Sequence, residues 1–311
     1  MSDNLYTIKV TEQAGFRLAH DPSKPRVWQM RLKSPNDGNH VAAITDRRET
    51  EQAQSTWCIG AHGCLLMVHL DVRAQGATYF ISPPITSSHE VSSNLFNPQW
   101  LEAQGLIEGT AQGRAAAWFI RLKDEQLVLR HYRRGGLPAR FSNDRFLWIG
   151  LRRSRPWREL SVLSRLHALG LPVPVPIAGR VQKKTVSYTA DIITRRIPGA
   201  RSLADFMLAS YFGDTHDQNA RDEVWRETGR VIRAFHAIGA HHADLNVRNI
   251  LVDEQRKVWL IDWDRGRLNA DAAIQNRSMA RLRRSLSREA ELETMARQGW
   301  PLLMSAYSRG P

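Results

Sequence analysis

Two short apolar runs in the last quarter of the chain end in side chains that suit metal and proton chemistry. Residues 241 to 253 read HHADLNVRNILVD, and residues 260 to 266 read LIDWDRG. The segments NILVD and VWLI are rich in strand-forming residues and flank the polar stretch EQRK, which predicts an antiparallel hairpin. One interpretation is an ordinary hairpin with polar ends. The other is a site for a metal ion and a phosphate.

The pairing of the hairpin predicts where its polar ends meet. If Asp253 pairs with Val258 across the turn, Asn249 lies directly opposite Asp262. Opposite residues of an antiparallel pair have Cα atoms about 5 Å apart. An amide oxygen and a carboxylate at that separation can share Mg²⁺, which keeps waters or phosphate oxygens as its other ligands. We therefore predict that Asn249 and Asp262 bind the metal.

The segment before the hairpin supplies a candidate catalytic carboxylate. Asp244 comes five residues before Asn249, on an irregular stretch that leads into the first strand. Its carboxylate can face the same site, orient a substrate hydroxyl and accept the proton of that hydroxyl. His242 belongs to the same catalytic group, and we expect it to hold the turn through hydrogen bonds.

The spacing of these residues is typical of phosphotransferases. HADLNVRN followed by DWD matches the protein-kinase patterns HRDxxxxN and DFG in their key positions. A lone HxD is a weak signal, but an Asn five residues later and an Asp eighteen residues later indicate phosphotransfer. Upstream, Arg130 in a predicted strand and Glu159 in a predicted helix fit the basic residue and its acidic partner. The stretch GTAQGR, with Gly109, Gly113 and Arg114, fits a turn that covers phosphates.

Periodicity predicts the elements that must position these groups. Residues 115 to 134 read as an antiparallel hairpin, residues 155 to 169 as a helix that stops at Gly170, and residues 187 to 197 as a strand. The proline-rich stretch GLPVPVPIAGRV predicts a rigid connector rather than a central strand. Ser202 and Asp205 form a capping-box pattern that opens another helix. Apolar residues at steps of four and three predict a helix over 221 to 239.

This order of elements predicts an α+β chain with a two-lobed, protein-kinase-like fold. Residues 63 to 197 would form the β-rich, nucleotide-binding N-lobe with one helix, and residues 198 to 311 the mainly helical C-lobe with the catalytic loop and acceptor site. Residues 1 to 62 have no sustained apolar period and are expected to be an N-terminal extension. Either disorder of this extension or a translation start at Met67 would explain its composition.

Composition narrows the class of partner. The chain has 44 Lys plus Arg against 31 Asp plus Glu, so its formal net charge is +13 and an anionic partner is expected. It has no signal-peptide layout and no apolar run long enough to span a bilayer, which predicts a cytosolic protein. Its two cysteines, Cys58 and Cys64, argue against a disulfide scaffold. Their spacing with His62 and His69 is unusual for zinc, so ordinary thiols are favoured.

Several stretches together resemble the 3-deoxy-D-manno-octulosonic acid (Kdo) kinases of Gram-negative bacteria, relatives of the lipopolysaccharide heptose kinases. The matching stretches are LRHYRRGGL at 129 to 137, the DRFLW run from residue 144, GLPVPVPIA, TADIITRRIPGA, HADLNVRNIL and VWLIDWDRGR. The resemblance runs from about residue 64 to the C-terminus. It implies a protein-kinase-like fold, ATP with Mg²⁺ as cofactors, and phosphorylation of the Kdo sugar of Kdo-lipid A.

The same resemblance implies a role for each motif residue. Asp244 would be the catalytic base, and Asn249 and Asp262 would hold the metal. Arg130 would stand where kinases place a phosphate-contacting lysine, with Glu159 as its partner. Adenine would rest against the backbone of residues 194 to 197. The protein would act at the cytoplasmic face of the inner membrane.

Two groups of arginines can each be interpreted either as binding residues or as an ordinary exposed surface. The first group flanks the expected cleft and would either contact the acceptor or form a solvated basic face: Arg133, Arg134, Arg152, Arg153 and Arg155. The second group shares one face of a C-terminal helix whose apolar stripe is Met279, Leu282 and Leu286: Arg277, Arg281, Arg284 and Arg288. This face fits either anionic lipid headgroups or an ordinary exposed helix side.

Two other functions stay open at the level of sequence. One is a kinase of the same fold that phosphorylates a heptose or an aminoglycoside-like acceptor. The other is a basic binding module that has lost catalysis. No nucleic-acid-binding motif is visible, so we do not expect nucleic acid to be the partner.

Overall fold

The computed structural model describes residues 68–84, 91–111, 117–133, 144–212 and 217–309, and the backbone of four strands nearer the N-terminus. The chain divides into two compact units, Met1–Glu51 and Gln52–Pro311. The first unit contains a three-stranded antiparallel sheet of β1 (Arg17–His20), β2 (Val27–Leu32) and β3 (His40–Thr45). All described residues predicted to carry chemistry belong to the second unit.

The N-lobe is built on a nine-stranded antiparallel sheet. Its order is β4 (Gln54–Thr56), β5 (Val68–Gln75), β6 (Thr78–Ser82), β11 (Pro176–Lys183), β12 (Ser187–Arg195), β9 (Glu125–His131), β8 (Ala117–Leu122) and β7 (Ile107–Ala111), with β10 (Phe146–Leu147) paired to β12. Short helices η1 (Ser93–Phe96), α1 (Pro98–Ala103) and η3 (Leu151–Arg153) lie between strands. The hairpin predicted over 115 to 134 is present as β8 and β9.

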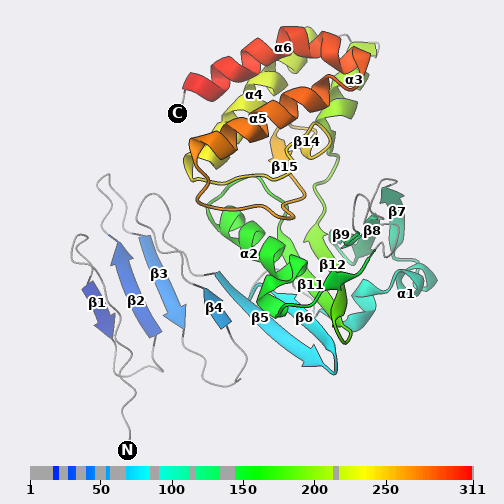
Figure 1. Cartoon of the computed structure of the whole chain (residues 1–311), viewed down its shortest axis with the longest axis vertical. Coiled ribbons are helices and arrows are strands. Elements are labelled where there is room, and N and C mark those ends of the chain that lie inside the picture. The colour runs from blue at the N-terminus through cyan, green and yellow to red at the C-terminus, as the bar shows by residue number, and fades with distance from the viewer. Residues whose placement is uncertain are drawn as a thin grey trace, which may run out of the picture. The chain divides into compact units, whose positions relative to one another are not determined.

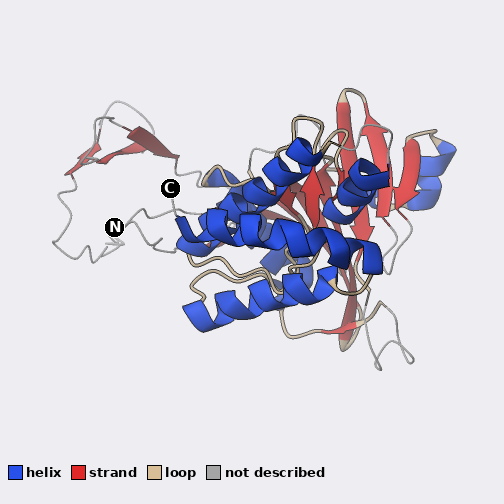
Figure 2. Cartoon of the chain, turned by 90° about the horizontal axis from the view of Figure 1, so that it is seen from above, coloured by secondary structure: helices blue, strands red, loops and turns tan. Residues whose placement is uncertain are grey.

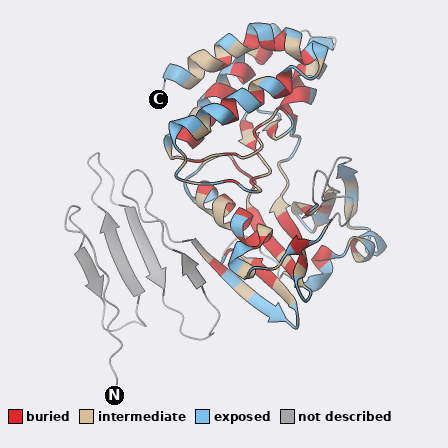
Figure 3. Cartoon of the chain, in the orientation of Figure 1, coloured by how far each residue is buried: buried red, intermediate tan, exposed pale blue. Residues whose placement is uncertain are grey.

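The predicted helix over 155 to 169 is confirmed as α2 (Arg155–Ala168), and it packs on the sheet. Leu160, Leu163 and Leu166 are buried, and Gly170 ends the helix with φ +73°. Figure 3 shows buried stretches along α2 in red. A Cβ on Gly179 of β11 would lie 2.7 Å from the Cβ of Pro156, so a glycine is needed for the helix to approach this closely. This tight contact fixes the height of α2 above the sheet, and with it the position of Glu159.

The prediction of a connector over 170 to 181 is wrong beyond residue 175. From Pro176 the chain forms β11, a central strand between β6 and β12. Pro176 is the first residue of the strand, where a missing N–H is tolerated. The next three residues and Val181 are also buried, as expected of a strand whose first half is covered on both faces.

The C-lobe contains most of the helices, which group together in Figure 1 and are coloured blue in Figure 2. These are α3 (Leu203–Phe212), α4 (Gln218–Ala237), α5 (Ala272–Leu286) and α6 (Ala290–Arg309). The predicted capping box is confirmed, because the Asp205 N–H donates to Ser202 Oγ at 3.1 Å. The helix predicted over 221 to 239 is confirmed as α4. Among the described residues, no helix has the length and apolar character needed to cross a bilayer.

A small sheet of β13 (Arg201–Ser202), β14 (Ile250–Val252) and β15 (Val258–Leu260) carries the predicted hairpin. Its predicted register is wrong by one residue, because Val252 pairs with Val258 and Ile250 with Leu260. The Asp253 carboxylate accepts from the N–H groups of residues 255 and 257, and Arg256 adopts φ 64°. The Asp253 N–H donates to the carbonyl of residue 257, so Asp253 faces residue 257 instead of Val258, and the left-handed Arg256 completes the three-residue loop 254 to 256.

Candidate active site

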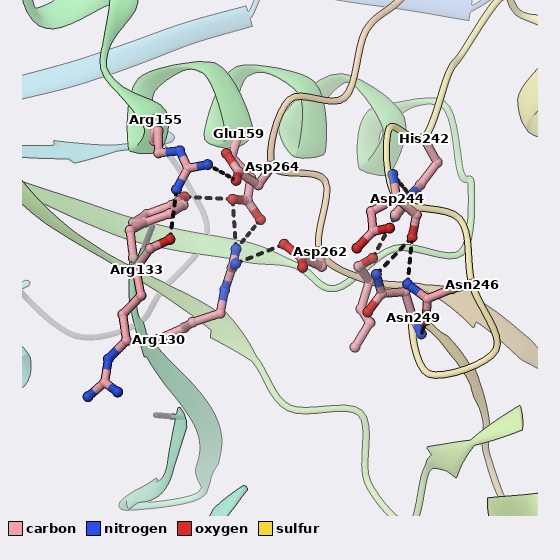
Figure 4. A network of polar contacts seen from close by, with 12 residues as sticks. Arg130, Arg133, Arg155, Glu159, His242, Asp244, Asn246, Asn249, Asp262 and Asp264 are labelled. Carbon is pink, nitrogen blue, oxygen red and sulfur yellow. Dashed lines mark hydrogen bonds and ion pairs between the residues drawn. The ribbon is translucent and has the colours of Figure 1, made fainter. Parts of the chain in front are cut away.

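A strand arginine joins three segments of the chain at the centre of the site (Figure 4). Arg130 of β9 donates through Nη2 to both carboxylate oxygens of Glu159, at 2.6 and 2.7 Å. Its Nη1 donates to Asp262, just after β15, at 2.8 Å. The predicted pairing of Arg130 with Glu159 is therefore present, and the aspartate of the DWD motif shares it.

The buried environment of this cluster shapes its charges. Glu159 is only 2% exposed and also accepts a hydrogen bond of 2.6 Å from the hydroxyl of Tyr132. Burial raises the pKa of Glu159 to about 7, and the guanidinium of Arg130 opposes that shift. Burial alone would lower the pKa of Arg130, but the carboxylates of Glu159 and Asp262 outweigh it and raise this pKa. Arg130 therefore carries a permanent positive charge in the cleft.

The catalytic loop is held by a buried histidine. His242 is 3% exposed, its Nε2 donates to the carbonyl of Ile261 at 2.7 Å, and its Nδ1 accepts from the Asp244 N–H at 3.2 Å. The ring packs edge to face on Trp263 at 4.8 Å, and burial lowers the pKa of His242. A neutral ring with both nitrogens occupied connects the loop to the segment around Asp262. This geometry fits the predicted holding role.

Two asparagines converge on one carbonyl of the loop. The side-chain nitrogens of Asn246 and Asn249 both donate to the carbonyl of Asp244 at 2.9 Å. Because the amide nitrogen of Asn249 is used in this way, its oxygen is the atom left for a cation. The prediction that Asn249 lies opposite Asp262 is wrong, since the carbonyl of Asn249 accepts from the Ile261 N–H and Asp262 comes one residue later. Both side chains still lie at the same end of the hairpin.

The donor set at this end fits a hard divalent cation. It offers the amide oxygen of Asn249 and the Asp262 carboxylate, of which one oxygen accepts from Arg130. Oxygen donors of this kind suit Mg²⁺, with phosphate oxygens and waters as further ligands. Asp262 adopts φ 62°, a left-handed conformation that costs a non-glycine residue about 1 kcal/mol or more and that recurs at active sites.

A second carboxylate of the DWD motif belongs to the cluster and was not predicted. Asp264 is 15% exposed and pairs with Arg155 of α2 at 2.8 Å. Burial raises the pKa of Asp264, while Arg155 and Arg130 lower it. Arg155 also donates to the carbonyl of Arg133 and lies over the ring of Phe146 at 4.5 Å. The second Asp of DWD was the sequence signal that could have revealed this contact.

The other predicted substrate and phosphate-turn residues do not join this cluster, or they lie outside the described residues. The side chain of Arg133 points away from the cluster in Figure 4, and Arg152 and Arg153 are exposed. Gly109 lies within β7, opposite Phe119, rather than in the turn. Outside the described residues lie Gly113, Arg114, Arg134, Cys58, His62 and Cys64.

The carboxylate of Asp244 has a partner that was not predicted. Arg281 of α5 donates to it at 2.6 Å, and each side chain is about half exposed. Arg281 was expected only as part of a basic helix face. Its pairing brings α5 into the neighbourhood of the catalytic loop.

A two-lobed fold in which a strand arginine, a helix glutamate and a post-hairpin aspartate meet beside an HxD loop defines a protein-kinase-like phosphotransferase. The sequence model described as "Lipopolysaccharide kinase (Kdo/WaaP) family" matches residues 98–307. The chain belongs to this family, and it is therefore an enzyme that transfers a phosphoryl group from ATP.

Several relatives extend the comparison. The chain is 37% identical to a 3-deoxy-D-manno-octulosonic acid kinase of Vibrio cholerae over 201 residues, which cover 65% of this chain and 82% of the relative. It is 44% identical to a kinase of the same name from Stenotrophomonas maltophilia over 195 residues, covering 62% and 74%. A solved structure titled "WaaP in complex with acyl carrier protein" matches with a TM-score of 0.45 and 16% identity, covering 70% of this chain and 86% of that one.

Proposed function

We propose that this protein transfers the γ-phosphoryl group of ATP to a hydroxyl of the Kdo sugar of Kdo-lipid A, a step of lipopolysaccharide inner-core biosynthesis. Family membership and the names of the relatives support the acceptor. The observation that carries the reaction type is the cluster in which Arg130 bonds to both Glu159 and Asp262, beside the loop that bears Asp244. ATP and a divalent metal follow from the kinase family, and Mg²⁺ is the metal that we propose.

The residues of the cluster have distinct proposed roles. Asp244 orients the acceptor hydroxyl and takes its proton while the hydroxyl oxygen bonds to the γ-phosphorus and the bond to the ADP oxygen breaks. Asn249 and Asp262 would hold Mg²⁺, which when bound neutralises charge on the phosphates. Arg130 contacts the phosphates, and Glu159 holds its guanidinium in place. His242 and Asn246 keep the loop rigid.

Two further contacts with ATP complete the proposal. The turn that includes Gly113 and Arg114, entered from Gly109, covers the phosphates. The backbone of residues 194 to 197, where the chain leaves β12, contacts the adenine. In this arrangement the strands hold the nucleotide and the C-lobe presents the base to the acceptor.

The proposed location is the cytoplasmic face of the inner membrane, because the acceptor is a membrane lipid. The side chains of Met279, Leu282 and Leu286 of α5 are buried, and that of Arg284 is exposed. Arg288 was predicted to share this helix face, but α5 ends at Leu286 and Arg288 is exposed in the turn that follows. Exposed arginines are attracted to anionic headgroups by roughly 1 kcal/mol each. The double variant Arg284→Gln with Arg288→Gln should sediment less than the wild type with phosphatidylglycerol vesicles. With neutral phosphatidylcholine vesicles, both proteins should sediment equally little. Unchanged sedimentation would remove these arginines as the membrane contact.

The deciding experiment is mass spectrometry of Kdo-lipid A after incubation with the protein, ATP and Mg²⁺. We expect a mass increase of one phosphate with the wild-type protein and none with Asp244→Ala. Heptose-containing and aminoglycoside acceptors are incubated and measured in the same way. Phosphorylation of those acceptors alone would overturn the Kdo assignment. Absence of ATP turnover with every acceptor would favour a binding module that has lost catalysis.

A further inference from the structure

A strongly basic cavity of about 290 Å³ opens next to the catalytic loop. Its lining includes Ala243, the neighbour of Asp244, and Arg281, whose guanidinium bonds to Asp244. The other polar side chains that line it are His241, Arg265, Arg267 and Arg277. No acidic residue lines this cavity in the described part of the chain. Four of its five polar lining residues are arginines, so the cavity is strongly cationic.

Three of these arginines lack an ion-pair partner, unlike several other arginines of the C-lobe. Arg265, Arg267 and Arg277 form no ion pair with another described residue, whereas Arg283 and Arg256 pair with glutamates at 2.6 and 2.8 Å. Like charges gathered without counter-charges repel one another, and an anion that binds among them relieves this repulsion. The arrangement is that of an anion site rather than of a network that stabilises the fold.

The backbone holds this charge cluster in place. His241 and Arg267 exchange two main-chain hydrogen bonds, at 2.7 and 3.0 Å, and Arg265 adopts φ 62°. The ring of His241 contacts Ser278 of α5 at 2.8 Å. Burial lowers the pKa of His241, and His242, Arg267 and Arg277 lower it further. Three segments are thus held around one space, and two of them, residues 265 to 267 and α5, contribute its positive charges.

We propose that this cavity binds the carboxylate of the Kdo sugar that is phosphorylated. The inference rests on the proposed function and deepens it. Arg281 is shared by the cavity and by Asp244, so an anion bound there lies next to the carboxylate that takes the proton of the acceptor hydroxyl. Kdo is itself an acid, and its carboxylate matches the forked donors of arginine. The phosphates of lipid A belong to a different sugar and lie further from that hydroxyl.

The shared arginine also connects acceptor binding with the base. In the structure Arg281 donates to Asp244 at 2.6 Å. A carboxylate in the cavity gives Arg281 a second anionic partner, which weakens its hold on Asp244. Asp244 then accepts from the acceptor hydroxyl instead.

The test compares the wild type with two single variants, Arg277→Gln and Arg265→Gln. For each protein, KM is measured for Kdo-lipid A and for ATP in neutral detergent micelles. Loss of a charge-assisted hydrogen bond should raise KM for the acceptor by roughly tenfold or more, with KM for ATP and the thermal midpoint unchanged. Arg297→Gln is the matched control, since Arg297 lies on α6 with 76% of its side chain exposed. The control should behave as the wild type.

Two modified acceptors identify the anion. Conversion of the Kdo carboxylate to a neutral amide should raise the acceptor KM of the wild type by the same factor as the arginine substitutions do. With this amide acceptor, Arg277→Gln should have the same KM as the wild type. Removal of the lipid A phosphates should leave the defect of Arg277→Gln intact. If that removal, and not the amide, abolishes the difference, the cavity binds lipid phosphate and the inference is overturned.

The failures of the two proposals can be told apart. If the wild type phosphorylates Kdo-lipid A normally and the KM of both variants is unchanged, the inference alone is overturned. If the wild type does not phosphorylate Kdo-lipid A, the proposed function fails and the inference fails with it.

Discussion

At the scale of single residues, the site separates groups that position from groups that react. His242 is buried and neutral, and Asn246 and Asn249 are tied to one carbonyl, so none of the three is free to move a proton. Asp244 keeps a carboxylate that is 44% exposed, with Arg281 as its ion-pair partner. An exposed pair of this kind contributes only about 0 to 1 kcal/mol to stability. Activity and stability should therefore respond independently to changes at Asp244.

Replacing Asp244 with alanine tests the base. We expect Asp244→Ala to lower the rate of phosphate transfer by about 10² to 10⁴, because proton acceptance is lost, with the thermal midpoint and ATP binding close to wild type. Transfer of labelled phosphate from ATP to Kdo-lipid A measures the rate. Asp222→Ala, at a helix position that pairs with Arg226 at 3.9 Å, is the control. A nearly normal rate in Asp244→Ala would remove this residue as the base.

Replacing Asp262 with asparagine tests the metal site. The amide loses the negative charge that attracts Mg²⁺, while Arg130 keeps both hydrogen bonds to Glu159. Nucleotide binding by calorimetry should lose its dependence on Mg²⁺ in Asp262→Asn. Asp264→Asn is the matched control, because Asp264 pairs with Arg155 and should keep that dependence. Equal Mg²⁺ dependence in Asp262→Asn and the wild type would contradict the assignment.

At the scale of elements, glycines set the distance between helices α4 and α6. A Cβ on Gly299 would lie 2.0 Å from Nε1 of Trp225, and one on Gly229 would lie 2.2 Å from the carbonyl oxygen of Leu303. Such contacts leave no room for a methyl group. The two helices can pack this closely only because both positions lack a side chain.

Replacing Gly299 with alanine should therefore lower the free energy of unfolding, although a change from glycine to alanine within a helix usually raises it. At an ordinary helix position the change stabilises by up to about 1 kcal/mol. Here the methyl group overpacks the interface, and we expect a loss of about 1 to 3 kcal/mol in urea unfolding. Ser308→Ala, at an exposed position of α6, is the control. A gain in stability for Gly299→Ala would show that the interface can open without cost.

The same interface contains a titratable group. His236 of α4 is 5% exposed, its ring contacts the hydroxyl of Tyr307 on α6 at 2.8 Å, and burial lowers its pKa from 6.5 to about 4. The unfolded chain binds a proton at a higher pH than the folded one. This contribution to stability is therefore present above pH 6.5 and lost as the pH falls to about 4, by roughly 3 kcal/mol in total.

His236→Gln should flatten this pH dependence. Urea unfolding at a series of pH values measures the slope in both proteins. The variant keeps a side chain that can bond to Tyr307 but cannot gain the proton, so it should lose less stability between pH 6.5 and 4. Parallel curves for the two proteins would rule out His236 as the source.

At the scale of the whole molecule, the parts needed for chemistry lie in the second unit. The family match begins at residue 98, and the boundary between the units falls after Glu51. The predicted boundary at residue 62 lies eleven residues further on, beyond β4, which pairs with β5. The N-lobe sheet therefore begins with β4, within the stretch predicted to be an extension.

Deletion of residues 1 to 51 should leave kinase activity close to that of the full chain, because no residue of the site is removed. Deletion of residues 1 to 75 is the contrasting control. It also removes β5, whose Leu70 is buried in the core, and it should lower both the thermal midpoint and the activity. A large loss of activity in the shorter deletion would assign a role to the first unit.

The sequence by itself determined the reaction class, the family, the helix around Glu159 and the C-lobe helices α3, α4 and α5, but not α6. These follow from residue types and short spacings, such as Asp244 to Asn249 and the leucines of α2, which are properties of neighbouring residues. The tertiary structure decided the hairpin register, the central place of β11, and the pairs of Arg155 with Asp264 and of Arg281 with Asp244. The register depends on the local turn with its left-handed Arg256, which the strand pattern does not reveal. The place of β11 and the two ion pairs join segments far apart in the chain, so they depend on how the elements pack. Periodicity does not record that packing.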